Sequence, residues 1–184
     1  EGFSGFQFES FRGAGGNDTI DGKGGEDRVE YLFSATGPVN VKLGNGAAAG
    51  SASDGLGGTD TLLNIEAVRG SDFADTLTGG GTHNATTRLY DYEVFEGAAG
   101  NDSIDGLGGF DIAVYSRAPA AVNVDLVSGV AIDGYGTQDS LASIEMVVGS
   151  DYADTITGSV PKRLASAAPG NIATLKPIQN TGSK

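Results

Sequence analysis

The feature that most constrains this chain is a nine-residue unit of glycine-rich turn and short strand. One unit runs from Gly13 to Asp21, and a second follows without a gap from Gly22 to Glu30. Both have Gly at positions 1, 3 and 4, Asp at position 6 and a β-branched residue at position 8. Glycine allows tight turns and strand side chains alternate between faces, so each unit predicts one turn and one strand. A single unit cannot bury its apolar face alone, so the pattern predicts a stack of units.

The alternation also predicts which side chains are buried. Ile20 and Val29, at position 8, are expected to point into a narrow core. Their neighbours are expected to face water, namely Thr19, Asp21, Arg28 and Glu30. The position-6 Asp places a carboxylate beside glycine carbonyls, and such oxygens are the ligands that Ca²⁺ prefers. The unit therefore predicts a stacked strand with a calcium site at its turn. The alternative is a solenoid without metal, in which these aspartates are ordinary turn residues.

A longer repeat relates the two halves of the chain. Residues 8–18 return as 92–102, 39–43 as 122–126, and 64–79 as 143–158. The sequence therefore predicts a first copy at 1–79, a connecting loop at 80–89, a second copy at 90–158 and a tail or linker at 159–184. We expect the aromatic lead-in of the second copy, Tyr90 to Phe95, to stack directly on Thr76–Thr78, which would join both copies in one solenoid.

Other turns keep parts of the pattern. A second glycine-rich turn ends at Asp60 in the first copy and at Asp139 in the second, and Asp111 ends a repeat of the second unit. A third, degenerate turn ends at Asp75 and Asp154, and there an aromatic residue replaces the position-4 glycine. Carbonyl ligation is less favourable in that turn, which favours a role in keeping its shape.

Charge and composition exclude several classes of function. The chain has 24 acidic and 11 basic residues, for a net charge of −13. Such a chain repels nucleic acids and anionic membranes, and a multivalent cation is the natural counter-charge. There is no Cys, which removes disulfides, zinc fingers and thiol catalysis. No apolar run reaches the roughly 18 residues of a membrane span. His83 is the one histidine and lies in the connecting loop, so we expect no catalytic residue and no enzymatic activity.

With these motifs, the chain resembles the RTX (repeats-in-toxin) family of secreted bacterial proteins. The resemblance implies an all-β fold, a parallel β-roll or β-solenoid that holds several calcium ions between stacked turns. In that family, position-6 Asp side chains and carbonyls of the glycine turns bind the ions. Carried over to this chain, the ligand candidates are Asp18, Asp27, Asp60, Asp102, Asp111, Asp139, Gly16, Gly25, Gly58 and Gly109, with Asp75 and Asp154 as weaker candidates.

Glutamate takes the place of Asp where the turn is poor in glycine, at Glu9, Glu66, Glu93 and Glu145. The resemblance implies that these residues are walls of ion sites, and the alternative is a solvated carboxylate at a sheet edge.

The resemblance further implies a secreted or cell-surface protein, exported in one step through a C-terminal signal (type I secretion). No signal peptide opens the chain, which begins inside the pattern, so we expect a fragment of a longer protein. The first interpretation of its function is a calcium-binding structural module that folds on Ca²⁺ outside the cell. The second is an assembly module of an adhesin, surface layer or fibre, with homo-assembly or a cell-surface partner. The third is a non-catalytic module of a secreted enzyme.

Overall fold

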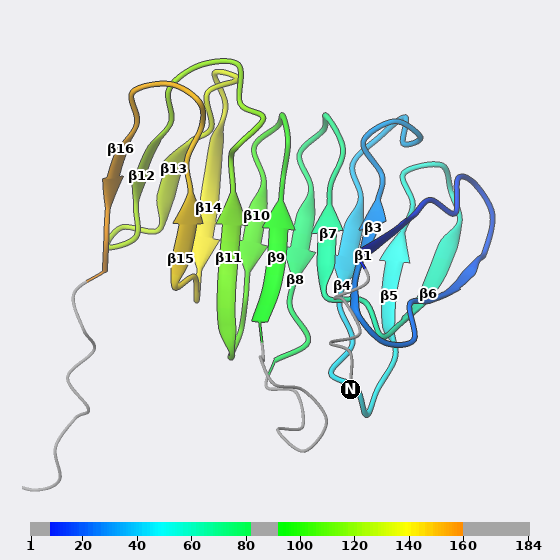
Figure 1. The fold of residues 1–184 in the computed structure, drawn as a ribbon. Helices are drawn as coiled ribbons and strands as arrows, with labels where there is room; N and C mark the ends of the chain where they lie inside the picture. The colour runs from blue at the N-terminus through cyan, green and yellow to red at the C-terminus, as the bar shows by residue number, and fades with distance from the viewer. Residues whose placement is uncertain (1–7, 82–91, 160–184) are drawn as a thin grey trace, which may run out of the picture.

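The computed structural model describes residues 8–81 and 92–159, which form sixteen β-strands (Figure 1). Within these residues there is no helix, and so none long and apolar enough to cross a membrane. His83, Tyr90, most of the expected connecting loop and nearly all of the tail lie outside the described residues. The all-β class predicted from the sequence is confirmed.

Six strands form a wholly parallel sheet. Its order is β1 (Phe8–Phe11), β3 (Glu26–Glu30), β7 (Ala67–Arg69), β9 (Tyr92–Glu96), β11 (Phe110–Val114) and β15 (Met146–Val148). The other ten strands form a second sheet against it. Its order is β16 (Thr155–Thr157), β12 (Asn123–Asp125), β13 (Val130–Ile132), β14 (Gln138–Ala142), β10 (Ser103–Asp105), β8 (Thr76–Thr78), β4 (Asn40–Lys42), β5 (Gly50–Ser53), β6 (Thr59–Leu63) and β2 (Thr19–Asp21).

The ten-stranded sheet is not wholly parallel, in contrast to the expected parallel roll. β5 pairs antiparallel with β4 and β6, and β13 pairs antiparallel with β12 and β14. The turn between β5 and β6 is therefore a hairpin. Gly55 and Gly57 in this turn have φ of 70° and 102°, and Gly134 and Gly136 have φ of 79° and 96° in the other hairpin. Positive φ at two glycines lets the chain reverse within a few residues.

The predicted burial at position 8 is confirmed. Ile20 is 7% exposed and Val29 is 0% exposed, and both belong to one apolar cluster that draws on both sheets. Leu77 of β8 and Phe95 of β9, each 0% exposed, belong to the same cluster. The core therefore lies between the two sheets and continues from the first half of the chain into the second.

Two expectations are wrong in detail. The lead-in strand β9 pairs with β7 and β11, whereas Thr76–Thr78 pairs with β4 and β10. The aromatic lead-in belongs to the parallel sheet and lies opposite the last strand of the first half, because each turn carries the chain from one sheet to the other. Glu30, expected to face water, is 4% exposed and its carboxylate accepts a hydrogen bond from Arg69 Nη1 at 3.0 Å. Arginines from neighbouring strands supply the charge that makes its burial tolerable.

Candidate metal centre

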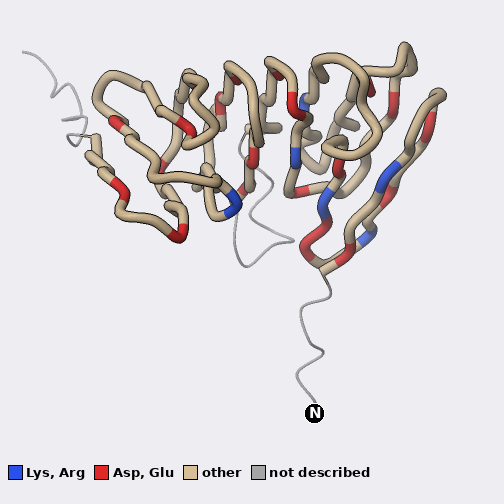
Figure 2. The backbone as a smooth tube through the Cα atoms, turned by 90° about the horizontal axis from the view of Figure 1, so that it is seen from above, with Lys and Arg blue, Asp and Glu red and all other residues tan. Residues whose placement is uncertain are grey.

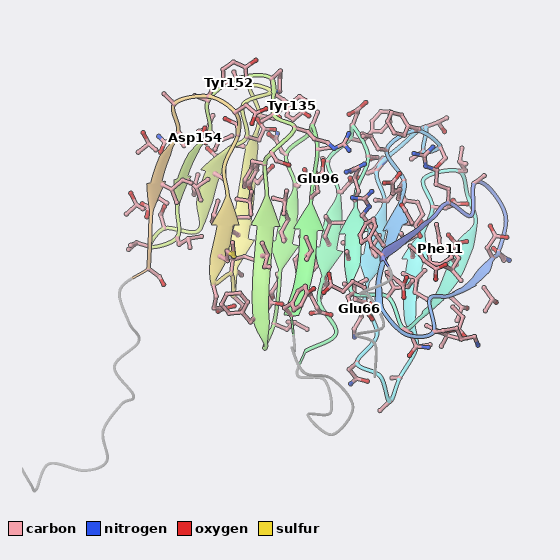
Figure 3. All side chains as sticks on the ribbon, in the orientation of Figure 1. Phe11, Glu66, Glu96, Tyr135, Tyr152 and Asp154 are labelled. Carbon is pink, nitrogen blue, oxygen red and sulfur yellow. The ribbon has the colours of Figure 1, made fainter. Side chains whose placement is uncertain are left out.

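The turns lie in two rows, one at each end of the strands. Figure 3 shows Tyr135 and Asp154 at the upper end and Glu66 at the lower end. The best-matched turns of the upper row end at Asp18 and Asp102, and those of the lower row end at Asp27 and Asp111. Each row therefore brings aspartates from both halves of the chain to the same end of the strands.

The four best-matched turns share a backbone conformation. At position 2, φ lies between 62° and 75° in Ala14, Lys23, Ala98 and Leu107. At position 4, φ lies between 126° and 140° in Gly16, Gly25, Gly100 and Gly109. The first range is left-handed helical and admits a side chain at some cost, whereas the second is essentially restricted to glycine. The glycine at position 4 is thus required by the backbone, while position 2 can vary.

The position-1 glycine makes room for the carboxylate of its own turn. A Cβ on Gly13 would lie 2.7 Å from Asp18 Oδ2, and a Cβ on Gly22 would lie 2.6 Å from Asp27 Oδ2. The same overlap would occur between Gly97 and Asp102 and between Gly106 and Asp111. In these turns one carboxylate oxygen occupies the space that a side chain would fill.

Carboxylate oxygens also accept hydrogen bonds from the backbone of neighbouring turns. The N–H of Asp18 donates to Asp60 Oδ1 at 3.1 Å, and the N–H of Asp75 donates to Asp102 Oδ1 at 2.8 Å. In the lower row, the N–H of Asp27 donates to Glu66 Oε2 at 2.9 Å. Glu145 accepts from Asp111 in the same way at 3.0 Å. Glutamate thus takes the bridging place of aspartate in the lower row.

The glutamates at the glycine-poor turns were predicted to be either walls of ion sites or solvated carboxylates. They differ in how deeply they are buried. Glu66 is 4% exposed and Glu93 is 1% exposed, so neither is a solvated carboxylate. Glu9 and Glu145 are exposed.

In the best-matched turns of the upper row, Asp18 Oδ2 and Asp102 Oδ2 are buried without a hydrogen-bond donor. Asp102 is 2% exposed, and burial raises its pKa to about 8. The N–H of Asp75 lowers that pKa, whereas the charges of Asp139, Asp75 and Asp133 raise it. A buried carboxylate oxygen without a donor is costly, and a cation beside it removes that cost. The donor set of carboxylate and glycine backbone therefore fits calcium.

Four other predicted ligands already have donors on both oxygens. Asp60 Oδ2 accepts from the Tyr31 hydroxyl at 3.1 Å, and Asp139 Oδ2 accepts from the Tyr115 hydroxyl at 3.0 Å. In the degenerate turns a serine supplies the donors. The Ser71 hydroxyl donates to Asp75 at 2.7 Å, its N–H donates to the other oxygen, and Ser150 does the same for Asp154. These four carboxylates have less need of a metal ion than Asp18 and Asp102.

Sequence reasoning missed two aspartates in the hairpin turns. Asp54 and Asp133 directly precede the hairpin glycines and are each 0% exposed. Their signal in the sequence is an aspartate at the same place in both halves, directly before the second glycine-rich turn. The predicted ligand Gly58 lies in the first of these hairpins, where the positive φ falls on Gly55 and Gly57. Gly58 is therefore not equivalent to Gly16, Gly25 or Gly109.

No group of three or more His, Cys, Asp or Glu side chains that could hold a metal ion occurs in residues 8–81 and 92–159. A site built from one carboxylate per turn and backbone carbonyls does not form such a group, because most of its ligands are main-chain oxygens.

A family model described as the RTX calcium-binding nonapeptide repeat matches four copies within residues 8–30, 65–84 and 93–113. These ranges include Asp18, Asp27, Asp75, Asp102 and Asp111, whereas both hairpin turns lie outside them. No curated protein matches the chain significantly.

Proposed function

Because this chain carries RTX calcium-binding nonapeptide repeats, we propose that it is a calcium-dependent structural module of a secreted bacterial protein. In this proposal the two sheets form a β-roll that folds when calcium binds outside the cell. The observation that carries the proposal is the pair of buried oxygens, Asp18 Oδ2 and Asp102 Oδ2, that have no donor. Bound calcium would supply the positive charge that a chain of net charge −13 lacks.

The proposed ligands are the side chains of the four best-matched turns, Asp18, Asp27, Asp102 and Asp111. The carbonyls of three position-4 glycines, Gly16, Gly25 and Gly109, complete the set. Asp27 and Asp111 are included because their carboxylates pack against position-1 glycines in the same way as those of Asp18 and Asp102. For Asp60, Asp75, Asp139 and Asp154 the ligand role stays a prediction that the donors described above make less favourable.

The size of the calcium effect follows from mass action. Extracellular calcium modules bind with Kd of about 10⁻⁴–10⁻³ M. At roughly 10 mM calcium each site then adds on the order of 1.4–2.7 kcal/mol to the free energy of unfolding. Several such sites together rival the ~5–15 kcal/mol that stabilises an ordinary domain. At the sub-micromolar calcium concentration of a cell interior the chain should stay largely unfolded.

We also propose that the chain is built from two copies, at 1–79 and 90–158. Equivalent contacts recur at the expected spacing and support this division. Tyr31 donates to Asp60 in the first half as Tyr115 donates to Asp139 in the second.

A calcium titration followed by far-UV circular dichroism tests the function. Asp102→Asn keeps the shape of the side chain and removes its charge, so it should raise the calcium midpoint several-fold. Asp72→Asn is the matched control, because Asp72 is exposed in a neighbouring turn of the same row. Full β structure in excess chelator would contradict the proposal, and so would an equal shift of the midpoint in both variants.

A second candidate function, the assembly module, is favoured by the C-terminal end of the described stack. β15 and β16 are the edge strands of their sheets there. Ile156, which occupies the core-facing place of a strand, is 46% exposed, and Met146 is 43% exposed. An open edge with apolar side chains is a site for pairing with another chain. Light scattering with and without calcium would test for such assembly.

A further inference from the structure

Asp54 is a buried aspartate that lies outside the nonapeptide repeats. It opens the hairpin turn between β5 and β6, and it is 0% exposed. Its Oδ1 accepts hydrogen bonds from the N–H groups of Leu56 at 2.7 Å and Gly58 at 2.8 Å. Its Oδ2 is buried and accepts no hydrogen bond. Burial raises the pKa of this carboxyl, but the N–H groups of Leu56, Gly58, Gly16 and Gly57 lower it by more, so the Asp54 carboxylate is held in its charged form.

The free oxygen of Asp54 faces a gap beside the first nonapeptide turn. A Cβ on Gly58 would lie 2.6 Å from Asp54 Oδ2 and would overlap the carbonyl oxygen of Gly16. Both oxygens thus border the space that the missing side chain of Gly58 leaves open. The hairpin is held against this turn by the N–H of Thr59, which donates to Asn17 Oδ1 at 2.8 Å.

Two more aspartates, Asp18 and Asp60, belong to these two turns. The N–H of Asp18, in the same turn as Gly16, donates to Asp60 Oδ1, and Asp18 Oδ2 has no donor. The Tyr31 hydroxyl donates to Asp60 Oδ2. Burial raises the pKa of Tyr31, and the charges of Asp60, Asp54 and Asp18 raise it further. The Tyr31 hydroxyl thus donates to one of the three aspartates whose charges raise its pKa.

The corresponding place in the second half is filled. Asp133 is also 0% exposed, and its Oδ1 accepts from the N–H groups of Tyr135 and Thr137 at 2.9 Å and 3.0 Å. The difference is that Thr137 stands where the first half has Gly58. Its hydroxyl donates to Asp133 Oδ2 and accepts from the N–H of Gly100 at 3.2 Å. In the second half, a threonine hydroxyl therefore donates a hydrogen bond to Asp133 Oδ2. In the first half, the equivalent oxygen, Asp54 Oδ2, accepts none.

We propose that Asp54 Oδ2, the Gly16 carbonyl and Asp18 Oδ2 form a divalent-cation site between the first nonapeptide turn and the β5–β6 hairpin. Hard oxygen donors of this kind select calcium among biological divalent cations that are abundant outside cells. The second half has no counterpart, because Thr137 closes it. The two halves therefore bind unequal numbers of ions. The inference rests on the proposed function, since Asp18 and the Gly16 carbonyl serve both, and Asp54 is the ligand that it adds.

Counting bound calcium ions by native mass spectrometry and isothermal titration calorimetry on the full chain tests this site. Asp54→Asn should bind one ion fewer than the wild type. Gly58→Thr, which introduces the hydroxyl of the second half, should also lose one ion. Thr137→Gly should gain one ion, and this gain keeps the test informative if Gly58→Thr fails to fold. Asp133→Asn is the matched control and should leave the number unchanged.

A second readout locates the ion. Terbium, a calcium substitute, should give luminescence sensitised in part by Tyr31, and that part of the signal should be lost in Tyr31→Phe and in Asp54→Asn. An unchanged ion count in Asp54→Asn, together with an unchanged terbium signal, would overturn the inference. If Asp102→Asn still loses an ion in that case, the proposed function stands. If the wild type binds no calcium, both fail together.

Discussion

At the scale of single residues, one neighbouring side chain decides whether both oxygens of a buried aspartate receive hydrogen bonds from the protein. Asp75 has the Ser71 hydroxyl and N–H beside it, whereas Asp102, in the adjacent turn, has Ala98 in the place of that serine. Ser71 donates twice, and Ala98 has no side-chain donor to offer. The same position-6 aspartate is therefore a turn anchor in one case and a candidate metal ligand in the other.

Protonation should partly replace calcium at these residues. Burial raises the pKa of Asp102 to about 8 and that of Asp139 to about 6, above the ~3.9 of an unfolded aspartate. The folded chain therefore keeps protons that the unfolded chain releases, and without calcium its stability falls as pH rises from about 4 to about 8. In calcium-free buffer we expect the β signal in circular dichroism to grow as pH is lowered from 8 to 5. Asp102→Asn should flatten this dependence, and a signal that grows with rising pH would contradict it.

At the scale of elements, the turns and the strand ends use different means of stabilisation. The nonapeptide turns depend on the positive φ of the glycine at their fourth position. The upper ends of β3, β7 and β9 depend instead on an ion-pair network. Arg69, 3% exposed, donates to Glu96 Oε2 at 2.7 Å and to Glu30 Oε1 at 3.0 Å. Arg12 also donates to Glu30, at 2.7 Å. This network joins neighbouring strands without any need for metal.

Alanine substitutions should distinguish glycines that need a positive φ from glycines that do not, by their effect on the free energy of unfolding. Gly100 has φ of 128°, and a Cβ there would overlap the carbonyl of Phe73. Gly24 has no atom within 4 Å of the place of a Cβ and no positive φ. Gly100→Ala should lower the free energy of unfolding by about 1–3 kcal/mol or more. Gly24→Ala should change it by less than about 0.5 kcal/mol. Urea unfolding at 10 mM calcium (roughly ten times the weakest expected Kd) measures both, and equal losses would show that φ does not govern position 4.

Removal of the central arginine should be costly at any calcium concentration. Arg69→Met leaves Glu30 and Glu96 buried without their shared partner, which should cost about 3–5 kcal/mol. Arg117→Met is the control, because Arg117 is 58% exposed and lies 3.6 Å from Glu96. Its loss should cost less than about 1 kcal/mol. Urea unfolding gives both values, and calorimetry should show an unchanged number of calcium ions in Arg69→Met.

At the scale of the whole molecule, positive charge is unevenly distributed along the stack. Figure 2 shows most Lys and Arg toward the end where the chain begins. Between residues 118 and 159 the sequence has Asp and Glu but neither Lys nor Arg. Both sheets nevertheless run without interruption from one half to the other through the pairs β7–β9 and β8–β10. The second half therefore pairs with strands of the first half, and in the proposed function calcium balances its negative charge.

An isolated second half should accordingly need more calcium. In residues 90–158 expressed alone, β9 and β10 would lose their pairing with β7 and β8, and Glu96 would lose its contact with Arg69. We expect its calcium midpoint in circular dichroism to lie above that of the whole chain, with lower cooperativity. The same midpoint and cooperativity in both would show that the halves fold independently.

The sequence by itself determined the features that depend on neighbouring residues. The nine-residue period predicted the strands, the burial of Ile20 and Val29 and the match to the calcium-binding nonapeptide repeat. This succeeded because φ preferences of glycine and the alternation of strand side chains act over a few residues.

Tertiary structure decided what lies beside each turn. The insertion of β5 as an antiparallel strand places a hairpin next to the first nonapeptide turn, and so brings Asp54 to Gly16. Glu30 is buried because Arg69, 39 residues away, reaches it from the adjacent strand. Asp18 and Asp75 close similar motifs, yet they differ in their donors. The physical reason is that a buried charge is stabilised by whichever groups surround it, and strands far apart in the chain bring those groups together.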